Sequence, residues 1–226
     1  FFAGDISVTG GKSYQERSFV RDWISNSPRP QLQTGLFGLF LHRDYANMVS
    51  KGTVDVAHER YPASSEQVIH PDRYPDERPV NVSVPDRSSA RWHRFDHDPV
   101  ADTVGQASIH AMFVTNGVQT GGVDTYGYKH PAAEGWGGDT LVPYRADGEY
   151  GYVWETAWDT RRDAEEFHAA YLELLESHGA TTEGDGVYVV PESDAFGDTF
   201  RVTLDGTRVR IVNAPSVSAL SAVHAE

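Results

Sequence analysis

Apolar and polar residues alternate along much of the second half of the chain, as they do in β-strands that bury one face. The alternation predicts strands at residues 139–144, 150–158, 187–190, 199–204 and 207–212. The last two form the clearest predicted hairpin, because Asp205-Gly206 separates them and this dipeptide favours a two-residue turn. The second half is therefore predicted to hold an antiparallel sheet.

One segment between these strands has instead the periodicity of an amphipathic helix. Thr160 and Asp163 are placed to cap its first turn, and Gly179 ends it. Its apolar stripe consists of Ala164, Phe167, Tyr171, Leu174 and Leu175. Similar patterns predict helices at residues 98–116 and 215–223.

In the first 60 residues, the pattern of apolar positions predicts three short helices, one at 13–24 and two within 42–59. Residues 62–91 are rich in proline, which indicates an extended segment, with 80–84 as an edge strand. The predicted fold class is α+β, with a helical first part followed by an antiparallel sheet and a long packed helix. We divide the chain into a helical segment at 1–60 and an α+β domain at 61–226, which together form one continuous globular unit.

The charge of the chain indicates the environment in which the protein works. The 33 acidic and 19 basic residues give a net charge of -14, and only three of the basic residues are lysines. Excess carboxylate destabilises a compact fold by repulsion, but molar salt shortens the Debye length to about 3 Å and screens that repulsion. The composition favours a halophile, with an ordinary acidic protein as the alternative. It argues against nucleic acid as a partner, because phosphate binding needs a basic face.

Four further features of the sequence bear on the location and processing of the chain. The chain has no cysteine, so it forms no disulfide. No apolar run approaches the roughly 18 residues that would cross a bilayer, so we predict no transmembrane segment. Asn81 begins the sequon Asn-Val-Ser and is the candidate glycosylation site. Because the chain begins at Phe1 rather than at Met, we expect a processed or trimmed product.

The common motifs of hydrolases are missing from the sequence. There is no His-Glu-x-x-His string, since Pro62 stands where the second histidine would follow His58-Glu59. There is no Gly-x-Ser-x-Gly elbow either. His93 and His97 have a spacing of four that would place both on one helix face as metal ligands. Polar surface is the simpler interpretation of this pair.

A second candidate group lies in the proline-rich segment. Glu66 and His70 are four residues apart, and Tyr74 follows them. His70 could donate to an oxyanion while Glu66 orients its ring, which makes the three residues weak catalytic candidates. The alternative, which we favour, is a buried polar knot that holds the segment in place.

The stretch from Ser64 to Tyr74 follows the pattern Ser-x-Glu-Gln-x-x-His-Pro-x-x-Tyr. In this motif the chain resembles haloarchaeal surface proteins that are related to predicted zinc metallopeptidases of bacteria. Further landmarks of that family are Thr103-Val-Gly-Gln106, Gly135-Trp-Gly-Gly-Asp139, Tyr150-Gly-Tyr-Val-Trp154, Trp158-Asp-Thr160 and Ile211-Val-Asn-Ala-Pro215. The resemblance extends over residues 60 to 224 and is loose before them.

The resemblance implies an upstream His-Glu-x-x-His helix and a glutamate as the third zinc ligand. This chain lacks the upstream helix, and Ala3 stands at the position of that glutamate. A methyl group cannot coordinate zinc. The resemblance thus implies a metallopeptidase-like protein whose metal site is missing, with residues 1–60 as the remnant of a peptidase-like helical region.

Three hypotheses about function follow. The first is a non-catalytic extracellular or cell-surface protein of a halophilic archaeon, with a structural or binding role, which contacts cell-surface components or forms a homo-oligomer. The second is the C-terminal portion of a processed zinc metallopeptidase whose metal-binding helix lies outside this chain. The third is a fibre or surface-layer subunit, in which residues 1–9 add as a strand to a neighbouring sheet. We expect no cofactor, with zinc or calcium as alternatives.

Overall fold

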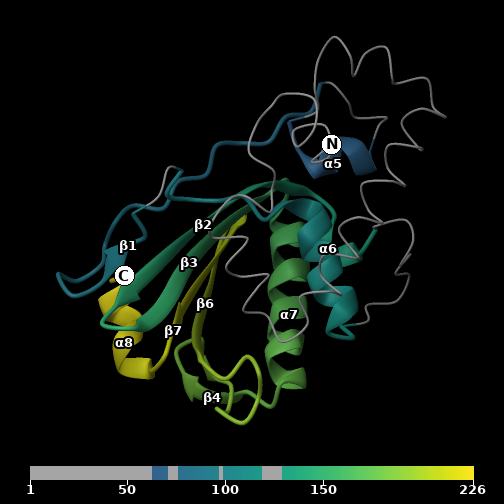
Figure 1. Ribbon diagram of the computed structural model, residues 1–226. Coiled ribbons are helices and arrows are strands. Elements are labelled where there is room, and N and C mark those ends of the chain that lie inside the picture. The colour runs from purple at the N-terminus through teal and green to yellow at the C-terminus, as the bar shows by residue number, and fades with distance from the viewer. Residues whose placement is uncertain (1–62, 71–75, 97–98, 119–128) are drawn as a thin grey trace.

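The computed structural model describes residues 63–70, 76–96, 99–118 and 129–226, and the account below concerns these residues alone (Figure 1). The helices predicted before residue 60 lie outside this part of the chain. So do Ala3, Tyr74 and His97 among the residues singled out from the sequence.

A seven-stranded antiparallel sheet forms the centre of the described part, in the order β1-β2-β3-β7-β6-β5-β4. The strands are β1 (His93–Arg94), β2 (Trp136–Ala146), β3 (Glu149–Trp158), β4 (Thr181–Gly184), β5 (Val187–Val189), β6 (Thr199–Asp205) and β7 (Arg208–Ala214). The prediction of a mixed α and β fold with an antiparallel sheet is confirmed. Strands β1 and β4, at the two edges, were not predicted.

Two-residue turns with glycine join three of the strand pairs. Asp147-Gly148 joins β2 to β3, and Asp185-Gly186 joins β4 to β5, with positive φ at all four residues. This is the conformation of type I′ turns, which asparagine or aspartate followed by glycine favours. The turn predicted at Asp205-Gly206 is one residue too early. Asp205 pairs with Arg208, so the turn begins at Gly206, whose φ is 59°.

The helices are α5 (Ser65–Ile69), α6 (Gly105–Thr115), α7 (Arg161–Ser177) and α8 (Val217–Val223), with a 3-10 turn η2 at Pro131–Ala133. The predicted capping pair is present in α7, since Thr160 Oγ1 accepts from Asp163 N and the Asp163 carboxylate accepts from Thr160 N. Helix α6 begins at Gly105 rather than near 98. Residues 99–104 form no helix, and Asp102 instead exchanges backbone hydrogen bonds of 2.9 and 2.8 Å with Leu141.

The predicted edge strand at 80–84 is wrong, although this segment does run beside β2. Val80 N donates to Gly137 O (2.7 Å), and Thr140 Oγ1 donates to Val82 O (2.6 Å). One of these two bonds comes from a side chain, so no regular ladder forms. The segment is held to the sheet at separate points instead.

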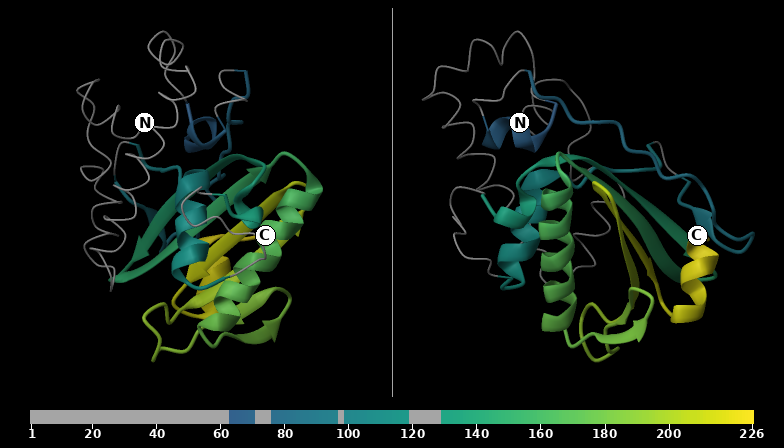
Figure 2. Two further views of the ribbon diagram at one scale, coloured as in Figure 1. Left: turned by 90° about the vertical axis from the view of Figure 1, so that its right-hand side faces the viewer. Right: turned by 180° about the vertical axis from the view of Figure 1, so that it is seen from behind.

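Helices cover both faces of the sheet (Figure 2). Helices α6 and α7 lie side by side on one face, where Trp154, Trp158 and Phe167 form an aromatic core and the rings of Trp158 and Phe167 stack at 4.7 Å. Helix α8 lies against the other face, over a second apolar cluster that includes Trp92 and Tyr144. Among the helices of the described residues, none has the length and apolar character needed to cross a bilayer.

Candidate functional site

The polar residues of the sequence landmarks meet at one end of the sheet. Here β2 begins, β3 ends, and helix α5 lies close to the first turn of α6 (Figure 1). We call the hydrogen-bonded side chains at this end the polar network. Its members are Ser65, Gln67, His70, Gln106, Glu134, Trp136 and Asp139.

Asp139, on β2, anchors the first turn of α6. Its carboxylate accepts from Val104 N (2.7 Å), Gly105 N (2.8 Å) and Trp136 Nε1 (2.8 Å). The first N–H groups of a helix have no partners within the helix. A negative charge close to this end also stabilises the helix through its dipole. The side chain therefore replaces the missing N-cap of α6, whose own residue Val104 has no side-chain oxygen. Trp136 is buried, and the bond to Asp139 satisfies its side-chain N–H.

The same environment sets the protonation behaviour of Asp139. Burial raises the pKa of its carboxyl group to about 6, because the charged form loses its hydration. The hydrogen bonds from Gly105, Val104 and Trp136 act in the opposite direction, and burial outweighs them. Asp139 is thus a group whose charge changes near pH 6.

Helix α5 completes the capping of α6 and fastens the proline-rich segment. Ser65 Oγ accepts from Ala107 N (3.2 Å). Gln67 Oε1 accepts from Ala63 N (2.6 Å), and Gln67 Nε2 donates to the backbone oxygen of Glu77. Gln67 therefore holds two points of the chain that lie 14 residues apart in sequence, Ala63 and Glu77.

His70 lies just after α5 and is buried. Its Nε2 atom lies 3.2 Å from Gln106 Nε2 and 3.2 Å from Glu134 Oε2. It thereby connects α5, α6 and the residue that follows η2. These contacts are those of a polar knot, the interpretation that the sequence favoured. The proposed partner of His70, Glu66, is bonded to it through the backbone, with His70 N donating to Glu66 O (2.8 Å).

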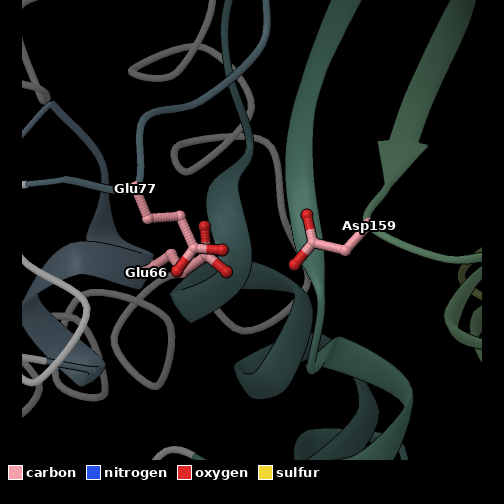
Figure 3. Close-up of side chains that lie close together, drawn as sticks. All are labelled: Glu66, Glu77 and Asp159. Carbon is pink, nitrogen blue, oxygen red and sulfur yellow. The ribbon is translucent and has the colours of Figure 1, made fainter.

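Three carboxylates converge beside this network. Glu66, Glu77 and Asp159 each place an oxygen within 4.8 Å of the other two, and we call them the carboxylate cluster (Figure 3). Glu66 is only 2% exposed, Glu77 is half-buried and Asp159 is exposed. All three take part in other interactions as well. An oxygen-only donor set suits a hard cation such as Ca²⁺ better than zinc, which prefers nitrogen and sulfur.

The remaining sequence candidates lie elsewhere. His93 is exposed and lies on strand β1 rather than on a helix, as a residue of the polar surface can; a metal site shared with His97 stays untested, because His97 lies outside the described residues. Asn81 is exposed, and its glycosylation stays a prediction. Among the described residues, the carboxylate cluster is the one group of three or more acidic, histidine or cysteine side chains whose ligand atoms converge.

Sequence reasoning missed Glu77, Glu134, Asp139 and Asp159 as members of this site. Two of them stood in quoted landmarks, Asp139 after Gly135-Trp-Gly-Gly and Asp159 within Trp158-Asp-Thr160. A carboxylate that follows a glycine-rich turn is a signal that could have been used. Glu77 and Glu134 carry no such signal, because only the folded chain brings them to the site.

The fold and the site define an α+β domain whose antiparallel sheet is fastened at one end by a buried polar network. Residues 93–224 match the family model "Domain of unknown function (DUF8575)", and the chain belongs to this family. The match covers more than half of the chain and includes every strand of the sheet. Neither the comparison with curated proteins nor that with solved structures gave a match.

Proposed function

We propose that this chain is a non-catalytic extracellular or cell-surface domain of a halophile, with a structural or binding role. In this proposal the motif residues fasten the fold rather than act on a substrate. In this proposal the ancestry is metallopeptidase-like, as the sequence motifs suggest, and the site does not act as a peptidase.

One observation carries the proposal: three of the motif side chains, Asp139, Ser65 and Gln67, form hydrogen bonds with the protein's own backbone. Asp139 accepts from two backbone N–H groups of α6, Ser65 accepts from a third, and Gln67 bonds the backbone at both ends of its amide. A catalytic side chain would instead direct at least one polar atom towards a substrate. Buried side chains that satisfy backbone groups stabilise a fold.

The donor set also weighs against the zinc peptidase hypothesis for the described residues. Zinc peptidases bind their metal largely through histidine nitrogen. The carboxylate cluster offers oxygen alone, and His70 is held by Gln106 and Glu134. The balance of 33 acidic residues against 19 basic ones supports the halophilic part of the proposal.

A paired measurement of activity and stability tests the proposal. The chain and its variants His70→Gln and His93→Gln are assayed for peptide hydrolysis with added zinc, and unfolded with urea in rising KCl. We expect hydrolysis at the level of the buffer blank in all three. We expect His70→Gln to lower the free energy of unfolding by about 1–3 kcal/mol, because buried polar partners lose their bonds. The exposed His93 serves as the matched control.

Two results would contradict the proposal. Zinc-dependent hydrolysis that His70→Gln abolishes and His93→Gln preserves would make His70 catalytic. Greater stability in dilute buffer than in multimolar KCl would remove the halophilic part, because screening would then bring no benefit.

A second candidate function is the binding of a hard cation by the carboxylate cluster. It is favoured by the convergence of three carboxylate oxygens within 4.8 Å. Titration of the chain with Ca²⁺ or Mg²⁺ tests it. Binding that Glu77→Gln weakens, and that Glu192→Gln on a distant exposed loop leaves unchanged, would support a structural cation. Equal affinities of the two variants would exclude the cluster as its ligand.

A further inference from the structure

His224 is buried without a hydrogen-bond partner for its ring. The residue caps the C-terminal end of α8, where its backbone N donates to Leu220 O (2.9 Å). Its side chain is 1% exposed, and neither Nδ1 nor Nε2 has a partner. A buried polar group that lacks a partner costs about 1–3 kcal/mol, so such a group calls for a ligand or a bound water.

The chain around His224 is positioned by arginines. Arg201 Nη2 donates to His224 O (2.6 Å), and Arg201 Nη1 lies 3.4 Å from Ser221 Oγ. Ala225 N donates to Arg87 O (3.1 Å), so the backbone of Arg87 lies beside the residue after His224.

Two of the arginines near His224 come from neighbouring strands. Arg201 is opposite Val212, and Val212 and Arg210 are two positions apart on β7, so Arg201 and Arg210 lie on the same face of the sheet. Arg94, on β1, completes the group.

These arginines make the surroundings of the ring positive. Burial, together with the charges of Arg210, Arg87, Arg201 and Arg94, lowers the pKa of His224 to about 4. The ring is therefore neutral at pH 7, with one N–H to donate. The nearby carboxylates are engaged with the arginines: Glu155 with Arg210 (2.6 Å), Asp86 with Arg94 (3.6 Å) and Glu226 with Arg201 (3.4 Å).

We propose that the ring of His224 and the surrounding arginines bind one chloride ion. A negative ion would accept from the unpartnered ring N–H and would be favoured by the positive charge of the four guanidinium groups. His224 is 1% exposed and closed to bulk solvent, so we take a single-atom anion as the ligand in preference to a larger one such as sulfate or gluconate. A water molecule would satisfy the N–H without any preference for chloride, and this difference makes the site testable.

Urea unfolding at pH 7 tests the site, with sodium chloride replaced stepwise by sodium gluconate at constant ionic strength. A ligand that binds only the folded state raises the folding equilibrium constant about tenfold when its concentration is ten times its dissociation constant. We expect this rise for the wild type. His224→Phe keeps an aromatic ring and loses the N–H, so it should lose the response, and Arg87→Gln should weaken it. Arg162→Gln, at an exposed arginine on α7, should respond like the wild type.

An equal chloride response in the wild type and in His224→Phe would overturn the proposal, as would equal effects of chloride and gluconate on the wild type. If His224→Phe does not fold, the width of the chloride-35 resonance decides. Broadening by the wild type that is stronger than broadening by Arg87→Gln supports the site. Equal broadening by these two proteins overturns it.

Discussion

The side-chain amide of Asn116 donates to Met112 O (2.7 Å) and so turns its oxygen towards His178 Nε2, 2.9 Å away. On the other side of the ring, His178 Nδ1 lies 3.1 Å from both carboxylate oxygens of Asp194. Both neighbours offer acceptor oxygens, so each ring nitrogen of His178 faces an oxygen atom. His178 thereby joins the ends of α6 and α7 to the loop that contains Asp194.

Replacement of Asp194 should loosen this junction. Asp194→Ala removes the acceptor of His178 and also that of Phe196 N, which donates to Asp194 Oδ1 (2.8 Å). We expect the free energy of unfolding to fall by about 1–2 kcal/mol, measured by urea unfolding, because hydrogen bonds that involve charge are lost. Ser193→Ala, at the exposed neighbour, is the control. Equal stability of the two variants would show that the junction contributes nothing.

The charge of Asp139 should make stability depend on pH. Its pKa is about 6 in the folded chain and 3.8 without burial, so the folded state holds a proton that the unfolded state releases. The contribution of this group is complete below pH 3.8 and is lost as the pH rises through 6. The wild type should therefore lose up to ~3 kcal/mol of its free energy of unfolding, relative to Asp139→Asn, from pH 4 to pH 7.

Comparison of two proteins is needed here because other groups titrate in the same range. Burial also raises the pKa of Asp198 to about 6, whereas the pKa of His224 falls to about 4, which acts in the opposite direction. Both effects are present in the wild type and in Asp139→Asn, and they cancel in the difference. The exposed Asp205→Asn provides the control profile. A difference between wild type and Asp139→Asn that does not change with pH would contradict the assignment.

The close approach of residue 80 to the sheet should make Gly138 sensitive to substitution. A Cβ atom at Gly138 would lie 2.5 Å from Val80 O, whereas one at Gly137 would lie 3.3 Å from its nearest neighbour, Ala157 O. We expect Gly138→Ala to lower the free energy of unfolding by about 1–3 kcal/mol, because overpacking displaces the backbone. Gly137→Ala should cost less. Hydrogen exchange at Val80 N, which bonds to Gly137 O, should quicken in Gly138→Ala.

The urea midpoints of Gly138→Ala and Gly137→Ala decide this prediction. If both glycine variants unfold at the same urea concentration, then the segment can move away from β2 at little cost. In that case the bond between Val80 and Gly137 does not hold the proline-rich segment, and its other bonds, such as that from Thr140 to Val82, attach it to the sheet.

The elements that were predicted correctly from the sequence are those with local causes. The cap of α7 follows from Thr160 and Asp163, which lie within one turn. The hairpin of β6 and β7 was placed to within one residue, because alternating residues flank a glycine turn. Strand β4 was missed although Asp185-Gly186 marks its turn, since all four of its residues are exposed and carry no alternation.

The candidate site was only partly predictable, for the reason that its partners are distant in sequence. Glu66 and His70 were singled out together, yet the atoms that meet the side chain of His70 belong to Gln106 and Glu134. Helix α6 begins at Gly105 rather than near residue 98 because Asp102 is paired with Leu141, and no local sequence pattern predicts this pairing. The surroundings of His224 likewise depend on Arg201, which is 23 residues away and on another element.

The sequence by itself determined the mixed fold class, the antiparallel sheet and the long helix α7, because turns, caps and the period of apolar residues act over one or two turns of chain. The tertiary structure alone decided which polar side chains meet. Asp139 reaches Val104 across 35 positions of sequence, and Gln106 reaches His70 across 36. Contacts of this kind form only in the folded chain, because their partners are far apart in sequence and come together when the elements pack and bury their apolar faces.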